Sequence, residues 1–439
     1  MNEQGKRVLI LGASYGGLYC AWFLHDLARK SSAPRPKITI IDRKNYVLYH
    51  AFLAECVSNQ VNPLSIAPSI RRIIGKRDIE FVQAEITEID AANKRAVTDC
   101  GTFEGDVLVL ALGGVTGYFG NKDFEKYGYP CKEMEDSLRL RNHIIECMER
   151  ADRSRDQEER RRLLTFVQAG AGATGLEVLT EVGDYVRKVC GKYYKSLNFR
   201  RDIRLILAEG MDRVLCTMEP DMSRAADSKL QRLGIEVRCG TLVSGAGPGY
   251  VDLKSGGEVK RIATETLIWV TGIKASPLIA GLPTEHDRMG RVVVDKLFQV
   301  SGFSDVYAVG DNAHVPDESG NPLGTTAQVA VQAGPALARN LLAKWEGREM
   351  TPFKYWNRGE MVSIGSLDAV STPFGHKVNG PLAWMMYKYV HFSKMPTWHS
   401  RLRTLSDWLL NWTSGPNIST LDYKGWMQDK KERHESAMQ

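Results

Sequence analysis

Two glycine turns, about one nucleotide-binding unit apart, constrain the fold of this chain more than any other feature. The first, Gly12 to Gly17, follows an apolar run at residues 8–11, and the second, Gly170 to Gly175, follows an apolar run at 164–167. A strand, a glycine turn and a helix present backbone N–H groups and a positive helix end to a pyrophosphate. The repetition predicts two bound dinucleotides that face each other, as hydride transfer from a nicotinamide to a flavin requires.

Composition is that of an ordinary globular protein. The 439 residues are 43% hydrophobic and 25% charged, which allows two or three domains with full cores. The formal charge of +6 comes without a long Lys/Arg block, so we expect no nucleic-acid partner, although it suits a surface that meets acidic lipid. We find no run of about 18 apolar residues, so we expect no membrane-spanning helix. The N-terminus lacks the apolar core of a signal peptide, so we expect none.

Apolar runs and helical stretches alternate along most of the chain, which predicts doubly wound sheets. In the first unit we expect a helix at 18–28 and strands at 8–11, 38–41, 81–89 and 107–113. In the second we expect a charged helical stretch at 133–163 and strands at 164–167, 203–208, 235–237 and 266–270. From Gly290 the pattern returns to the first unit, with a strand at 306–309 and a helix at 326–343.

Each glycine turn is followed by an acid at the end of the next strand. Asp42 lies 25 residues after Gly17, where a carboxylate can accept the ribose hydroxyls of an adenosine. Glu209 lies 34 residues after Gly175 and predicts NADH rather than NADPH, because a 2′-phosphate would meet a like charge. Nearby Arg213 weakens that preference.

The first dinucleotide site is predicted from small residues and acids that follow strands. Ser14 stands at the second glycine position of the first turn and brings the phosphates slightly closer to a side chain. Gly310 and Asp311 follow the strand at 306–309, and alone they indicate a turn. With both glycine turns present the chain is similar to flavoproteins that bind two dinucleotides, in which such an Asp typically bonds the ribityl or phosphate part of the flavin, and we expect the same of Asp311. Candidate residues for the first site are Gly12, Ser14, Gly16, Gly17, Asp42, Gly113, Gly310, Asp311, Ala327 and Gln328, and for the second Gly170, Gly172, Gly175, Glu209 and Gly272.

These residues make the chain resemble the type II NADH dehydrogenases, single-subunit NADH:quinone oxidoreductases among the flavoproteins with two dinucleotide-binding domains. The resemblance covers nearly the whole chain and is carried by residues 12–17, 138–144, 170–177, 268–277, 310–311 and 327–332. It implies FAD as the cofactor and NADH as the substrate. It also implies a quinone partner, reduced by two electrons without proton pumping.

The most specific match is the helical segment 327–332, which fits the family's quinone-site pattern A-Q-x-A-x-Q. Gln328 and Gln332 form an i, i+4 pair on one helix face. Their amides can donate to a quinone carbonyl and a flavin carbonyl, or simply to backbone. The resemblance favours the former.

Three further residues are interpreted through the resemblance. Glu177 matches a family glutamate close to the nicotinamide and flavin, although an acid in the first turn of a helix stabilises the dipole in any case. Lys377 matches a family lysine near the flavin N5, where a cation stabilises the reduced flavin; the alternative is a loop lysine facing water. His50 stands where the family commonly has glutamine, and is either part of the flavin site or a core histidine.

The C-terminal part carries two apolar stripes at helical spacing. They comprise Leu382, Met385, Met386, Tyr389 and Val390, and then Trp398, Leu402, Leu405, Leu409 and Trp412. Basic residues accompany them, and five of the nine tryptophans follow residue 380: Trp384, Trp398, Trp408, Trp412 and Trp426. This pattern predicts peripheral binding to anionic lipid at the cytoplasmic face of a membrane. The same surface could join two subunits, so we also expect a homodimer.

The fold class is therefore α/β, with two Rossmann-like doubly wound dinucleotide-binding domains and a C-terminal amphipathic helical membrane-binding region. We expect the first part of an FAD-binding domain at 1–115 and an NADH-binding domain at 116–275. Residues 276–350 complete the FAD-binding domain with the quinone-site helix, and 351–439 form the membrane anchor.

The main alternative is a sulfide:quinone oxidoreductase, which needs two reactive cysteines at the flavin, one of them late in the chain. The eight cysteines are scattered without zinc spacing or a C-x-x-C pair, and the last is Cys239, so Cys131 would lack its partner and no metal site is expected. The same spacing argues against a disulfide reductase. Another FAD-dependent NAD(P)H oxidoreductase, a reductase of a phylloquinone precursor and a flavin-binding membrane redox sensor without turnover remain open.

Overall fold

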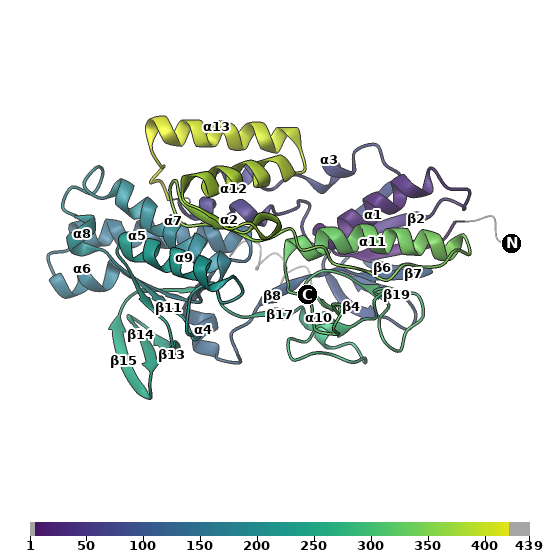
Figure 1. Cartoon of the computed structure of the whole chain (residues 1–439), viewed down its shortest axis with the longest axis horizontal. Coiled ribbons are helices and arrows are strands. Elements are labelled where there is room, and N and C mark those ends of the chain that lie inside the picture. Colours follow the sequence, from purple (N-terminus) through teal and green to yellow (C-terminus); the bar gives the residue numbers. More distant parts are fainter. Residues whose placement is uncertain (1–4, 421–439) are drawn as a thin grey trace.

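The computed structural model describes residues 5–420, and the predicted Trp426 lies outside this range. Figure 1 shows two α/β units side by side, with the C-terminal helices stacked across one face. The first unit is built on a parallel five-stranded sheet in the order β19-β7-β1-β2-β3. These strands are β1 (Arg7–Leu11), β2 (Lys37–Asp42), β3 (Ile79–Gln83), β7 (Val107–Leu110) and β19 (Val306–Ala308). Every residue of β7 and β19 is buried, as expected for a parallel sheet covered on both faces.

Two long helices cover one face of this first sheet. Helix α1 (Tyr15–Ala28) lies along α11 (Ala327–Trp345). A Cβ at Gly334 would stand only 2.5 Å from the carbonyl oxygen of Gly16, so glycine allows the two helices to touch. The strand at 306–309 and the helix at 326–343 therefore return to the first unit, as the sequence predicts.

The second unit repeats the design in the sheet order β12-β11-β10-β16-β9. Its strands are β9 (Gly128–Pro130), β10 (Thr165–Ala169), β11 (Arg204–Ala208), β12 (Ile235–Arg238) and β16 (Thr266–Trp269). Its helices are α4 (Lys122–Tyr127), α5 (Met134–Arg153), α6 (Gln157–Leu163), α7 (Ala173–Val189), α8 (Phe199–Asp202) and α9 (Pro220–Arg232). An antiparallel sheet of β13 (Thr241–Gly247), β14 (Tyr250–Ser255) and β15 (Glu258–Ala263) projects from it.

Shorter elements connect and edge the two units. The chain crosses between them on β8 (Gly114–Thr116) and β17 (Ile273–Ala275), which pair antiparallel. The remaining helical turns are η1 (His50–Phe52), α2 (Leu53–Val57), η2 (Pro63–Ser65), α3 (Ile70–Ile74), α10 (Pro277–Ala280) and η3 (Pro373–Gly375). The remaining strands of this group are β4 (Ile86–Asp90), β5 (Arg95–Thr98), β6 (Gly101–Glu104), β18 (Val292–Val293) and β20 (Ala313–His314).

Two predicted elements are each divided in the structure. The strand expected at 81–89 is β3 followed by β4, because the chain turns after Gln83 and β4 pairs antiparallel with β5 in a separate sheet. The helix expected at 133–163 is α5 followed by α6, since Ser154 has extended backbone and Asp156 caps the new helix. The mixed α/β class with parallel sheets is confirmed.

The C-terminal segment forms a third layer. It contains β21 (Met361–Ser363), β22 (Ala369–Ser371), β23 (Val378–Asn379), α12 (Pro381–Lys394) and α13 (Trp398–Ser414). Figure 1 shows α12 above α2 and α7, with α13 outermost. Within residues 5–420, no helix combines the length and the apolar character that crossing a bilayer requires.

Candidate functional site

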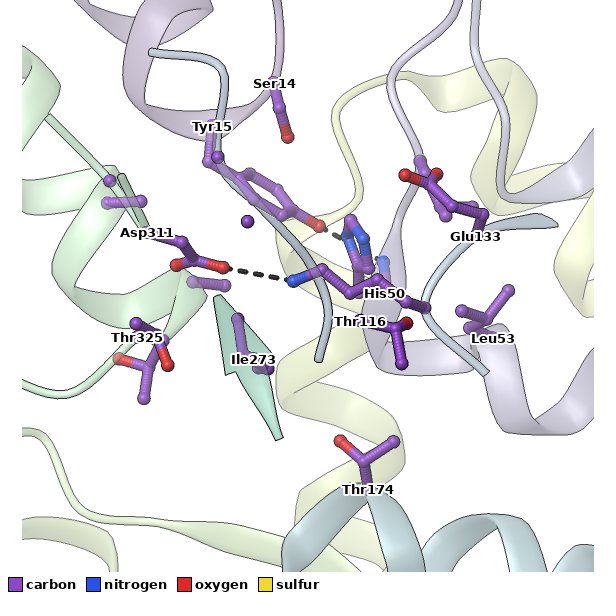
Figure 2. Close-up of a pocket in the computed structure, with 18 of the residues that line it drawn as sticks. Ser14, Tyr15, His50, Leu53, Thr116, Glu133, Thr174, Ile273, Asp311 and Thr325 are labelled. Atoms are coloured by element: carbon purple, nitrogen blue, oxygen red, sulfur yellow. Dashed lines mark hydrogen bonds and ion pairs between the residues drawn. The ribbon is translucent and has the colours of Figure 1, made fainter. Parts of the chain in front are cut away.

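One cavity of about 440 Å³ opens between the two units and is lined by both. The first unit contributes its glycine turn and residues from 42–54, 111–114, 309–311 and 325–330, and the second contributes Thr174, Glu177 and 269–272. Figure 2 shows Asp311 and Thr325 on one side, Leu53 and Glu133 on the other, and Thr174 facing them from the second unit. The carboxyl ends of the first sheet's strands meet here, which is where open α/β sheets bind ligands.

Backbone sterics explain the glycines of the first turn. Gly12 has φ +104°, and a Cβ there would stand 2.2 Å from the carbonyl oxygen of Ala111. A Cβ at Gly17 would stand 2.0 Å from the carbonyl oxygen of Gly12. Ser14 precedes α1 as its N-cap residue, and its side chain makes no capping bond and lines the cavity. The turn therefore holds the first N–H groups of α1 toward the open volume.

Asp42 braces this turn from the end of β2. Its carboxylate accepts from the backbone N–H of Ala13 at 2.7 Å and from that of Lys44 at 2.9 Å. Burial raises the pKa of Asp42, and the two backbone hydrogen bonds oppose that rise. The same carboxylate lines the cavity, so it can both hold the turn and accept ribose hydroxyls.

Another part of the cavity wall consists of uncrowded glycine backbone and one ion pair. A Cβ at Gly113 would have no atom within 4 Å, and one at Gly310 would meet only the Cβ of Ala330 at 3.9 Å. The Asp311 carboxylate accepts from the Lys132 ammonium at 3.1 Å, and both residues line the cavity. This uncrowded backbone, next to a turn of N–H groups and a cation, fits the pyrophosphate and ribityl chain of FAD.

The second glycine turn is constructed like the first. Gly170 has φ +101°, and a Cβ at Gly175 would stand 2.2 Å from the carbonyl oxygen of Gly170, whereas Gly172 is open to a radius of 4 Å. Glu209 accepts from the backbone N–H of Ala171 at 2.6 Å and from that of Met211 at 2.9 Å, as Asp42 does in the first unit.

The structure also places Gly272 and Arg213, the two other residues of the second unit that the sequence analysis singled out. Gly272 lines the shared cavity with φ +76°, close to the carbonyl of Gly117. Arg213 donates to the carbonyls of Met218 at 2.9 Å and Cys216 at 2.8 Å. Its guanidinium is therefore held by the loop after β11, and it offers no salt bridge to Glu209.

Glu177 stands on the cavity wall in the first turns of α7. Its Oε1 accepts from the backbone N–H of Ser363 at 3.3 Å, and the Tyr387 hydroxyl, which donates to the carbonyl of Ala51 at 2.8 Å, lies beside the carboxyl. Burial is the largest cause that raises the pKa of Glu177 to about 8. A carboxyl that is neutral at pH 7 can donate a proton into the cavity.

The two glutamines of the A-Q-x-A-x-Q segment use their amides on backbone. Gln328 donates to the carbonyl of Gly359 at 3.1 Å and accepts from the N–H of Arg358 at 2.7 Å. Gln332 donates to the carbonyl of Trp356 at 3.0 Å and accepts from its N–H at 3.1 Å. Ala327 and Ala330 line the cavity in their place. The structure thus shows the backbone bonding that the sequence allowed as the alternative, which fastens segment 356–359 to α11.

Lys377 lies away from the residues that line the cavity. Its ammonium is 3.1 Å from Asp221 and 3.4 Å from Glu219, and the hydrogen bond to Asp221 raises the pKa of Lys377. The structure therefore does not bring Lys377 to the cavity. The lysines that line it are Lys44 and Lys132, which sequence reasoning missed because neither belongs to a motif.

His50 belongs to the cavity rather than to the core. It lines the cavity, and its backbone N–H donates to the Tyr15 hydroxyl at 3.3 Å (Figure 2). Burial lowers the pKa of His50 to about 4, so the imidazole is neutral at physiological pH.

A comparison with protein families matches residues 6–334 to the model described as pyridine nucleotide-disulphide oxidoreductase. The chain belongs to the pyridine nucleotide-disulphide oxidoreductase family. Curated relatives agree with the resemblance inferred from the motifs. A type II NADH:quinone oxidoreductase of Staphylococcus saprophyticus is 28% identical over 89% of this chain and 95% of its own length. A demethylphylloquinone reductase of Synechocystis is 30% identical over 94% of this chain and 99% of its own length.

Solved structures show the same fold for this family member. NDH2 of Plasmodium falciparum, solved with NADH, superposes with a TM-score of 0.86 at 19% identity and covers 95% of this chain and 100% of its own. The sulfide:quinone oxidoreductase of Aquifex aeolicus superposes with a TM-score of 0.72 at 15% identity and covers 94% of this chain and 96% of its own. Because both fall below 25% identity, they establish the fold alone.

The outer helix of this oxidoreductase turns its polar side inward. Ser400 and Thr404 of α13 are buried, whereas the apolar stripe points to solvent, with Leu402 64%, Leu409 58% and Trp412 85% exposed. On α12, Leu382, Met385 and Tyr389 are likewise exposed. The apolar faces predicted from the sequence are therefore on the surface rather than in the core.

Proposed function

We propose that this family member transfers a hydride from NADH to FAD and then two electrons to a membrane quinone, without pumping protons. One observation carries the proposal: a single cavity is lined both by the first glycine turn with its acid, Asp42, and by Glu177 and Gly272 of the second unit. Two dinucleotides bound at such turns meet at the cavity, where a nicotinamide C4 can approach a flavin N5 within about 3.5 Å.

The chain's contribution to this reaction is binding and orientation. FAD supplies the hydride acceptor when bound. Asp42 and Glu209 would each accept ribose hydroxyls while holding their turns, and the Lys132 ammonium would offset the negative charge of a pyrophosphate or reduced flavin. Glu177 would give a proton to the quinone.

The remaining site roles follow the same division. Residues 1–115 and 276–350 would bind FAD through Gly12, Ser14, Gly16, Gly17, Asp42, Gly113, Gly310, Asp311 and Ala327. Residues 116–275 would bind NADH through Gly170, Gly172, Gly175, Glu209 and Gly272. Gln328 and Gln332 would contribute by holding segment 356–359 beside the cavity, and we assign them no direct contact with the quinone.

We infer that α12 and α13 dock the protein on the cytoplasmic face of a membrane. The support is the outward stripe of Leu402, Leu405 and Leu409, because apolar side chains flanked by tryptophan and arginine suit the headgroup layer. Such a surface also delivers the enzyme to a lipid-soluble substrate. We also propose a homodimer in which a second copy of the chain shares part of this face.

The names of the curated relatives suggest two candidates for the quinone that accepts the electrons. Several are named type II NADH:quinone oxidoreductase, and the Synechocystis relative is named demethylphylloquinone reductase. Sulfide chemistry has no comparable support, since Cys131 is buried, bonded to Ser137 at 3.3 Å, and burial raises its thiol pKa to about 12. A nucleophilic thiolate is thus disfavoured at this cavity.

A steady-state assay tests the proposal. The purified protein, reconstituted with FAD and anionic vesicles, is given NADH with a benzoquinone, a 2-unsubstituted naphthoquinone, or sulfide in place of NADH. We expect NADH oxidation that depends on quinone, and the preferred ring identifies the acceptor class. Quinone reduction by sulfide but not by NADH would reject the proposal.

A further inference from the structure

Three glutamates, two buried and one half-buried, lie at the cavity wall, where α2, α7 and α12 meet. Glu177 and Glu181 are one turn apart on α7, and Glu55 comes from α2. Glu177 lines the cavity, whereas Glu55 and Glu181 are only 4% and 6% exposed. The negative charge of Glu55 acts on both of the other carboxyls. Three carboxylates cannot all be ionised so close together unless cations or protons neutralise them.

A single lysine neutralises one of the three. The Lys388 ammonium on α12 donates to Glu55 Oε1 at 2.6 Å, and the Trp408 indole N–H on α13 donates to Glu55 Oε2 at 2.9 Å. Both oxygens of Glu55 are therefore occupied by donors, and its charge is compensated. The other two carboxyls are left to hold protons: burial, then Glu55, raises the pKa of Glu181 to about 7.

Other charged groups packed against the cluster are already engaged. Asp184 on α7 bonds Ser366 and Arg187, and Arg141 on α5 donates to Asn59 and Asn142. On α13, Asp407 accepts from Asn62 and Ser65. On α12, burial lowers the pKa of His391 to about 4, so its imidazole is neutral. Among the described residues that face the cluster, Lys388 is thus the cation paired with a glutamate.

Hydrogen bonds connect the cluster to the surface, and Glu177 brings it to the cavity. Ser58 Oγ donates to Glu181 Oε2 at 2.5 Å, and Gln60 Nε2 donates to the same oxygen at 3.3 Å from a half-buried position at the edge of α2. One turn along α7, Glu177 lies beside the Tyr387 hydroxyl and lines the cavity. Glu181 therefore lies between solvent at Gln60 and the acid that faces the substrate.

We propose that Glu181 is a proton relay that recharges Glu177 from the surface at Gln60, and that the negative charge of Glu55 keeps it protonated. The inference rests on the proposed function. Reduction of a quinone to a quinol takes two electrons and two protons. NADH gives both electrons and one proton as a hydride, so the second proton comes from water. Glu177 donates to a quinone oxygen, Glu181 passes its proton to Glu177, and solvent reprotonates Glu181.

The test compares two electron acceptors in the FAD-loaded, vesicle-bound protein. A quinone needs protons, whereas ferricyanide takes electrons alone, so relay variants should separate the two. We expect E181Q to lower kcat with a benzoquinone about tenfold or more at pH 7 and to leave kcat with ferricyanide and flavin content unchanged. E149Q, on α5 beside Tyr194, is the matched control and should change neither rate.

The Glu55–Lys388 pair has its own pH signature. Quinone turnover of the wild type should fall as pH rises through the range of 7 to 8, since the donating carboxyls ionise. E55Q removes a negative charge and leaves Lys388, which lowers the pKa of Glu181, so the fall should move to lower pH while ferricyanide turnover does not move.

Three outcomes overturn the relay. Equal losses with both acceptors in E181Q would show a structural role, and an unchanged quinone rate and pH profile would show that the cluster is not used. A wild type that reduces ferricyanide but no quinone would instead reject the proposed function, and the relay with it.

Discussion

Replacing two leucines of the outward stripe should weaken membrane binding by a calculable amount. Leu405 and Leu409 are one turn apart on α13 and are 52% and 58% exposed. Placing the exposed part of each side chain in lipid stabilises the bound state by about 1–1.5 kcal/mol. The L405S/L409S double variant should therefore lose about 2–3 kcal/mol, a roughly 30- to 150-fold weaker partition coefficient.

Cosedimentation with vesicles that contain anionic lipid measures this partition. The matched control is L242S/V259S, because Leu242 and Val259 are 61% and 59% exposed on the antiparallel sheet of the second unit, away from α13. The control should bind like the wild type, and both variants should oxidise NADH equally with a water-soluble quinone. Binding of L405S/L409S as tight as that of the wild type would refute the docking face, and equal losses in both variants would indicate nonspecific hydrophobic adsorption.

Three other perturbations have defined outcomes. Because the pKa of Glu177 is raised from 4.5 to about 8, its contribution to stability is present at low pH and lost as pH rises through 8. The free energy of unfolding of E177Q should equal that of the wild type at pH 5 and exceed it by about 2 kcal/mol or more at pH 9. A difference in urea titrations that does not change with pH would contradict this. E209A should lower the KM for NADPH toward that for NADH with little change in kcat, and an unchanged KM ratio would argue against Glu209 at the ribose. K377A should keep NADH:quinone turnover within about twofold, because its ammonium is held by Asp221 and Glu219, whereas K132A should lose flavin, measured by the visible absorbance ratio.

The parts of the site set by local sequence could be predicted. Gly12, Gly17 and Asp42 follow from a strand, a turn and the next strand, and these steps are short enough to be read from spacing. The structure shows a second role for Asp42, since its carboxylate also stabilises the glycine turn by accepting from the N–H of Ala13. Glu209 stabilises the second turn in the same way by accepting from the N–H of Ala171.

Partners far apart in the chain could not be predicted. Glu55 and Lys388 are separated by 333 residues, and Lys132 and Asp311 by 179, so no periodicity connects them. The motif at 327–332 predicted the helix and the placement of Gln328 and Gln332 on one of its faces. It could not show that segment 356–359 would occupy both amides, because that segment has no regular structure.

The C-terminal stripes were predicted from helical spacing, but their direction was not. A stripe such as Leu402 and Leu409 normally packs inward, and only the burial of Ser400 and Thr404 shows that α13 docks by its polar side. The direction is decided by tertiary contacts such as the bond between Trp408 and Glu55.

An anaerobic titration of the purified protein with NADH tests the central claim most directly. The account predicts yellow protein whose flavin absorbance is bleached by about one equivalent of NADH and returns when a short-chain quinone is added. Protein that neither retains nor takes up FAD, or whose bound flavin stays oxidised in excess NADH, would contradict it.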